Sequence, residues 1–127
     1  MGKILGLGGI FIKAHDPKTL ADWYEQHLGI PFDGNSYVNL PYADPEGKLT
    51  NGYNVLSFFP HQATYYAPSE KEAMINLRVE DLAGLMEDLK NKGVEFIGEP
   101  IDEEYGKFAW IMDPEGNKIE LWEPPVE

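Results

Sequence analysis

The hydrophobic and polar positions along the chain follow one pattern twice. Residues 10–16 and 75–81 each alternate apolar residues with others and end on an aspartate. Such alternation predicts a strand with one buried face. Each segment is followed by apolar residues spaced three and four apart, which predict a helix with one buried face. The two helical sets are Leu20, Trp23, Tyr24 and Leu28, and Leu82, Leu85, Met86 and Leu89.

Capping residues mark the ends of both predicted helices. Asp16, followed by Pro17, and Asp81 are the expected N-caps, because a short side-chain oxygen can accept from the free N–H groups of the first turn. Gly29 and Gly93 follow the last apolar positions, as left-handed C-terminal caps do. We expect short strands over residues 29–32 and 93–96.

The second halves of the two copies also match. Asp-Pro-Glu-Gly occurs at residues 44–47 and again at 113–116, and such a sequence predicts a tight turn between two strands. We expect the strands after these turns to span 54–59 and 117–122. Pro60 and the Pro124-Pro125 pair would end them.

Each copy therefore reads as one strand, one helix and three strands. The prediction is an α+β fold in one domain, residues 1–127, with modules at 4–60 and 73–125 and a linker at 61–72. A module with one helix covers one sheet face, so two modules packed together would form a sheet around a cup. Two ferredoxin-like halves are the alternative, but these carry two helices per copy.

Composition narrows the function. Ten basic and 22 acidic residues give a formal charge of −12, which disfavours binding to nucleic acid phosphates. No apolar run approaches the ~20 residues of a membrane span, and the first residues do not form a secretory signal. We therefore expect a soluble, cytoplasmic protein with no membrane partner. The absence of cysteine excludes disulfides, thiolate zinc sites and a cysteine nucleophile.

The chain resembles the vicinal oxygen chelate superfamily, which includes glyoxalase I, bleomycin-resistance proteins and extradiol dioxygenases. The residues that carry the resemblance are Asp16-Pro17, Trp23-Tyr24, Leu28-Gly29 and the run Asp-Pro-Glu-Gly-Asn-Lys-Ile-Glu-Leu at 113–121. The resemblance implies paired βαβββ modules, an incomplete barrel around a central cup, and a homodimer.

Metal-dependent members of that superfamily place four ligands in the cup, which by the resemblance correspond to Gly9, Ser57, Met74 and Glu120. Only Glu120 offers a ligand suited to a divalent ion, since such ions take imidazole and carboxylate groups. We therefore expect neither a metal nor another cofactor. Glu120 is the candidate catalytic residue, as a hydrogen-bond acceptor or general base. The alternative is a relic carboxylate that pairs with a nearby lysine or arginine.

Strand alternation predicts which side chains face the cup. Aromatic side chains dominate this set, which favours a flat or partly aromatic ligand. His61 begins the linker, in which Tyr65 and Tyr66 would fold over the cup. The expected ligand-binding residues are Phe11, Ser57, Phe59, Met74, Asn76, Trp110, Glu120, Trp122 and His61.

Three functions remain in competition. The first is metal-independent binding of a small, partly aromatic or amphipathic molecule. The second is a metal-dependent lyase, isomerase or dioxygenase with rearranged ligands, which would need His61 to reach Glu120. The third is a dimeric interaction module that takes no ligand.

Overall fold

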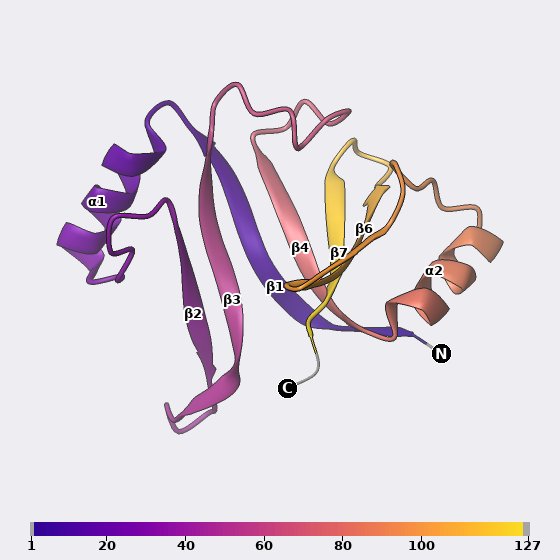
Figure 1. Cartoon of the computed structure of the whole chain (residues 1–127), viewed down its shortest axis with the longest axis horizontal. Coiled ribbons are helices and arrows are strands. Elements are labelled where there is room, and N and C mark those ends of the chain that lie inside the picture. Colours follow the sequence, from indigo (N-terminus) through magenta and orange to yellow (C-terminus); the bar gives the residue numbers. More distant parts are fainter. Residues whose placement is uncertain (1, 126–127) are drawn as a thin grey trace.

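The computed structural model describes residues 2–125 and shows two helices beside one open sheet. The helices lie beside opposite ends of the sheet, and the hairpin of β2 and β3 projects beyond the rest (Figure 1). In chain order the elements are β1 (Lys3–Ala14), α1 (Pro17–Leu28), β2 (Tyr37–Ala43), β3 (Leu49–Pro60), β4 (Ala73–Glu80), α2 (Leu82–Asn91), β5 (Ile101–Glu103), β6 (Gly106–Met112) and β7 (Lys118–Glu123).

The sheet joins the two modules through their first strands. Its order is β2-β3-β1-β4-β7-β6-β5, and β1 pairs antiparallel with β4. Within the modules, β1 pairs parallel with β3 and β4 pairs parallel with β7. The two copies of the pattern are thus arranged alike on either side of the β1–β4 pair, and the expected α+β architecture is confirmed.

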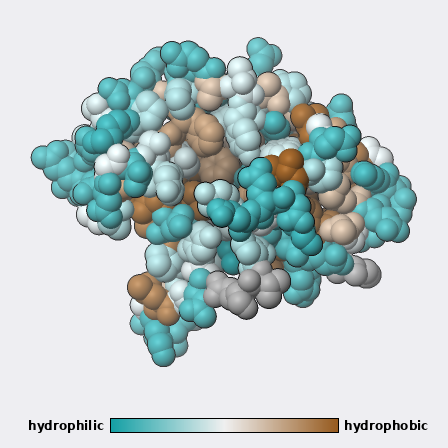
Figure 2. All heavy atoms as spheres, in the orientation of Figure 1, coloured by the Kyte–Doolittle hydropathy of each residue, from teal (hydrophilic) through white to brown (hydrophobic). Residues whose placement is uncertain are grey.

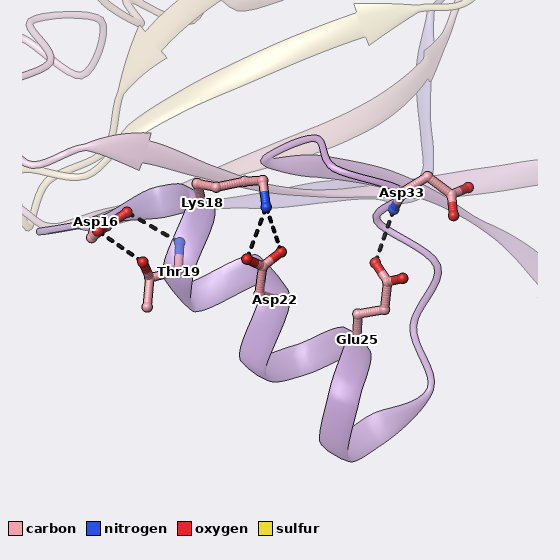
Figure 3. Close-up of polar contacts among 6 residues, drawn as sticks. All are labelled: Asp16, Lys18, Thr19, Asp22, Glu25 and Asp33. Carbon is pink, nitrogen blue, oxygen red and sulfur yellow. Dashed lines mark hydrogen bonds and ion pairs between the residues drawn. The ribbon is translucent and has the colours of Figure 1, made fainter.

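Helix α1 begins and ends as the sequence predicts. Asp16 accepts hydrogen bonds from the backbone N–H and the hydroxyl of Thr19, at 3.1 and 2.8 Å (Figure 3). These bonds hold the pKa of Asp16 below its usual range, chiefly through the backbone N–H of Thr19. At the other end Gly29 adopts a left-handed conformation with φ of 71°. The loop after the helix is fastened by Glu25, which accepts from the backbone N–H of Asp33 at 2.9 Å.

Helix α2 and both predicted turns also form. Asp81 accepts from the backbone N–H of Gly84 at 3.1 Å and caps α2. In the two Asp-Pro-Glu-Gly turns the last glycine N–H donates to the carbonyl of the first aspartate. The two aspartate side chains accept from the N–H two residues further on as well. The repeated sequence therefore forms the same local structure twice.

The strand expected over residues 29–32 does not form, so the first module has one strand fewer than predicted. Pro31 has no N–H to donate to a neighbouring strand, and the chain turns at Asp33 and Gly34, which both have positive φ. The side chain of Phe32 is nevertheless buried at 1% exposure. In the second module the matching segment is reduced to one bridge between Phe96 and Ile111.

Each helix packs on its own module and forms a separate core. The first core contains Ile12, Leu56 and Phe58 from the strands, and the second contains Leu77, Ala109 and Leu121. These strand residues are those that alternation assigns to the helical face. In the view of Figure 2, hydrophobic residues concentrate in the middle, between hydrophilic ends that carry the helices.

The middle of the helical face has no cover in the described chain. Ile10 and Ile75, which alternation along β1 and β4 places on the helical face, are Cα partners in the β1–β4 pair and are 41% and 44% exposed. Ile4 and Leu7 pair with Val79 and Leu77 and extend the same row, at 44% and 50% exposure. Helix α1 packs beside one end of this face and α2 beside the other, so neither helix covers the row (Figure 1). Neither helix combines the length and apolar character of a membrane span.

Candidate functional site

A pocket of about 280 Å³ opens on the face of the sheet opposite the helices, where the cup was expected. Both modules contribute to it, since its walls come from β1, β2 and β3 and from β4, β6 and β7. Six of its ten lining residues are aromatic, so the walls are mostly rings with a few polar groups. The lining residues are Phe11, Tyr37, Asn39, Tyr53, Val55, Asn76, Tyr105, Phe108, Glu120 and Trp122.

Glu120 is the charged group of this pocket, and it is almost fully buried at 2% exposure. Its Oε1 accepts from Nδ2 of Asn76 at 2.6 Å, and its Oε2 accepts from Nε1 of Trp110 at 2.9 Å. The sheet register sets this arrangement, because both donors are direct strand neighbours of Glu120. Oε2 also accepts from the hydroxyl of Tyr65. The carboxylate thus accepts from three neutral donors, and among residues 2–125 it forms no ion pair.

The connection between β3 and β4 supplies the lid over this carboxylate. Burial, followed by the charge of Glu120, raises the pKa of the Tyr65 hydroxyl well above the usual tyrosine value. Nζ of Lys118 donates to the backbone carbonyl of Tyr65 at 2.7 Å and lies over the rings of Tyr65 and Trp110. Burial lowers the pKa of Lys118. The lysine thus fastens the lid instead of pairing with Glu120.

Asn76 has its amide orientation fixed by the carboxylate. Because Nδ2 faces Glu120, Oδ1 must face the other way, toward Gly8. A Cβ at Gly8 would overlap Oδ1 and come within 3.0 Å of the Trp122 ring. Oδ1 is buried and accepts no hydrogen bond from residues 2–125. The side chain therefore has one acceptor to spare beside the pocket.

The structure brings most of the predicted residues together, in two groups. Phe11, Asn76, Glu120 and Trp122 line the pocket itself. Phe59, Met74 and Trp110 lie in the packing around it: Phe59 and Met74 form a cluster with Phe11 and Tyr66, and Trp110 donates to Glu120. Ser57 is the Cα partner of Phe11, but it does not line the pocket.

His61 is placed elsewhere. Its ring stacks on His15 with centroids 4.5 Å apart, and its Nε2 lies 3.7 Å from a carboxylate oxygen of Glu72. The groups that contact Glu120 are Tyr65, Asn76 and Trp110 instead. The histidine is part of the connection after β3, and the structure does not join it to the pocket.

The expected ligand-binding residues did not include six that line the pocket, namely Tyr37, Asn39, Tyr53, Val55, Tyr105 and Phe108. Tyr37, Asn39 and Tyr53 share one sheet face with Val55 and Ser57, which alternation along β2 and β3 would have indicated once the register was known. Tyr105 lies in the turn between β5 and β6, where alternation gives no signal. Tyr65 was expected only to lie near the cup, and its bond to Glu120 could not be read from the sequence.

The residues at the four positions of the superfamily metal site do not fit a divalent ion. Of these positions, only Glu120 carries an ionisable ligand, and its two oxygens already accept three hydrogen bonds. Among residues 2–125, no three His, Cys, Asp or Glu side chains gather closely enough to hold a metal. The groups around Glu120 are instead hydrogen-bond donors, from Tyr65, Asn76 and Trp110, and they hold the carboxylate in a hydrogen-bonded network.

Known proteins match the chain over nearly its whole length. Residues 6–121 match the model of the Glyoxalase/Bleomycin resistance protein/Dioxygenase superfamily. The uncharacterized protein YetH of Bacillus subtilis (strain 168) is 41% identical over 122 residues, which are 92% of this chain and 97% of that protein.

Solved structures share the fold at low sequence identity. A methylmalonyl-CoA epimerase of Streptomyces coelicolor, in complex with 2-nitronate-propionyl-CoA, has a TM-score of 0.70 at 19% identity, covering 98% of this chain and 100% of that one. The methylmalonyl-CoA epimerase of Mycobacterium tuberculosis has a TM-score of 0.65 at 17% identity, with 97% and 90% covered. At these identities the likeness concerns the fold.

Proposed function

The chain belongs to the glyoxalase/bleomycin resistance protein/dioxygenase superfamily, and on that basis we propose that it binds a small, partly aromatic or amphipathic molecule in its cup without a metal ion. Ring faces would hold the body of the ligand, and the Glu120–Asn76 pair would orient it. Pockets of this kind, apolar with a few convergent polar groups, are the usual sites for small molecules.

The observation that carries the proposal is the buried carboxylate of Glu120 beside a pocket lined with rings. Oε1 accepts one protein hydrogen bond, from Asn76, and a carboxylate oxygen can accept two. A ligand N–H or O–H can therefore complete the set. A catalytic role for Glu120 stays a prediction, as does a cytoplasmic location.

The metal-dependent alternative finds less support in the structure. It required His61 to reach Glu120, and the ring of His61 stacks on His15 instead. No other histidine or acidic residue is a neighbour of Glu120 in the two strands that pair with β7. We therefore favour binding of an organic molecule through hydrogen bonds and ring contacts.

The three tryptophans allow a direct test by NMR. Trp110 and Trp122 lie at the cup, and their indole N–H groups donate to Glu120 and to the carbonyl of Tyr105. Trp23 lies on α1 and is 50% exposed, so it is an internal control. In a screen of neutral aromatic fragments in EDTA, we expect saturable shifts of the first two indole signals and none of the third. Shifts that require added divalent metal, or that occur only at Trp23, would contradict the proposal.

We also propose that the protein is a homodimer, formed through the uncovered row of aliphatic side chains on β1 and β4. Ile4, Leu7, Ile10 and Ile75 are each at least 41% exposed along two neighbouring strands. Contiguous exposed apolar surface of this kind is typical of interaction sites. Because β1 and β4 are equivalent strands of the repeated pattern, the row has approximate twofold character, which suits contact with a second copy.

A further inference from the structure

Arg78 is the only arginine of the chain, and it is not among the residues that line the pocket of Glu120. Its guanidinium carbon lies 5.2 Å from the ring centroid of Trp122, 5.8 Å from that of Tyr53 and 5.9 Å from that of Tyr42. Contacts with ring faces on several sides hold a planar guanidinium in one orientation. The arginine is thus placed before any ligand binds.

Most of the hydrogen-bonding capacity of Arg78 is unused. A guanidinium has five N–H donors, and here one of them donates to the backbone carbonyl of Tyr53 at 3.4 Å. The ion pairs of the described chain join other residues, and none includes Arg78. Its side chain is partly buried, and the guanidinium keeps N–H donors that a further acceptor can use.

Arg78 borders an open groove of about 640 Å³ between the first half of β1 and the hairpin of β2 and β3. No acidic residue lines it, and its polar lining comes from Thr50, Asn54 and Tyr42 besides the arginine. The full lining is Leu5, Gly6, Leu7, Tyr42, Thr50, Gly52, Asn54 and Arg78. An anion in this groove would therefore meet one fixed cation and neutral polar groups, with no carboxylate in contact.

Irregularities of β1 create the groove. The strand pairs with β3 only over Gly9–Ala14, and its register with β4 shifts on both sides of the segment from Gly6 to Leu7. Bulges of this kind bend a strand away from its neighbour. The first half of β1 thus leaves β3, and the side chain of Arg78 reaches the opening between them.

We propose that this groove is a binding site for an oxyanion, a carboxylate or phosphate group of a small molecule, with Arg78 as its principal ligand. The planar fork of N–H donors matches two oxygens of such a group, and bonds between charged partners are the strong ones. The amide of Asn54 is the neutral donor at hand, because the hydroxyl of Thr50 donates to the backbone carbonyl of Tyr42 at 3.2 Å. The groove adjoins the cup, since Tyr53 and Trp122 line the cup pocket and also contact Arg78. The oxyanion site does not depend on the function proposed for the cup.

The single arginine makes the test specific, because the chain has one arginine Nε–H signal in a ¹⁵N spectrum. We would titrate the protein with sodium phosphate and sodium acetate, and with sodium chloride at matched ionic strength. A saturable shift of the Arg78 signal with phosphate or acetate, absent with chloride, supports the site. The oxyanion that binds with the higher affinity then shows whether the natural ligand carries a phosphate or a carboxylate. Equal, non-saturating shifts with all three salts would overturn it.

Variants test the role of the guanidinium. Arg78→Gln should weaken oxyanion binding about tenfold or more, and Arg78→Lys should weaken it by less, because it keeps the charge but loses the fork. The matched control is Lys92→Gln, which removes the same charge from the exposed end of α2. Calorimetry gives the affinities. Equal affinity in Arg78→Gln and wild type would overturn the assignment, and so would an equal loss of affinity in Lys92→Gln. If Arg78→Gln does not fold, the NMR titration of the wild-type protein decides the question.

Discussion

The neighbouring tyrosines at positions 65 and 66 test the hydrogen bonds at Glu120 with one chemical change at two sites. The hydroxyl of Tyr65 donates to Oε2 of Glu120, a carboxylate with 2% exposure. Tyr65→Phe removes this bond and leaves the carboxylate with one donor fewer. A hydrogen bond to a charged group contributes about 1.5–3 kcal/mol, and because Tyr65 itself is 38% exposed we expect the lower end of that range.

Tyr66→Phe is the matched control. The hydroxyl of Tyr66 is buried and has no hydrogen-bond partner among residues 2–125, so its removal should leave the free energy of unfolding unchanged or raise it. Urea unfolding followed by fluorescence measures both differences. An equal loss in the two variants, or no loss in Tyr65→Phe, would refute the network described for Glu120.

Three further perturbations address other parts of the structure. Burial raises the pKa of both Tyr65 and Tyr66 above the ordinary tyrosine value of 10.0. The folded state therefore holds these phenolic protons more tightly than the unfolded state does. The urea midpoint should decline as pH rises past about 10. A midpoint that holds steady there would contradict this burial. In Gly8→Ala the added Cβ would overlap Oδ1 of Asn76. Such overpacking should lower the free energy of unfolding, measured in urea, by about 1–3 kcal/mol. An unchanged free energy would mean that the space beside Gly8 is not filled. Ile10→Lys should convert the proposed dimer to a monomer in sedimentation analysis, whereas a monomeric wild type would contradict the dimer.

Much of the fold could be predicted because its signals are local. The caps at Asp16 and Asp81, the two Asp-Pro-Glu-Gly turns and the alternation of the strands each depend on a few neighbouring residues. The expected strand over 29–32 failed for a reason also visible locally, since Pro31 cannot donate to a ladder. Alternation places Ile10 and Ile75 on the helical face, but the sequence does not show that the helices leave them uncovered.

The site was less predictable because its geometry depends on pairing between distant strands. Alternation places Asn76 and Glu120 on the cup face, but only the register of β4 against β7 makes them partners. The bond from Tyr65 to Glu120 spans 55 positions and comes from a connection without regular structure. The groove beside Arg78 likewise depends on where β1 leaves β3, which no pattern in the chain indicates.

Native mass spectrometry of protein purified without additives tests directly whether the cup takes an organic molecule without a metal ion. We expect an adduct with the mass of a small organic molecule and no divalent metal, with the adduct lost or reduced in Glu120→Ala and retained in the surface control Glu115→Ala. A stoichiometric divalent metal that disappears in Glu120→Ala, or a cup that is consistently empty, would contradict it.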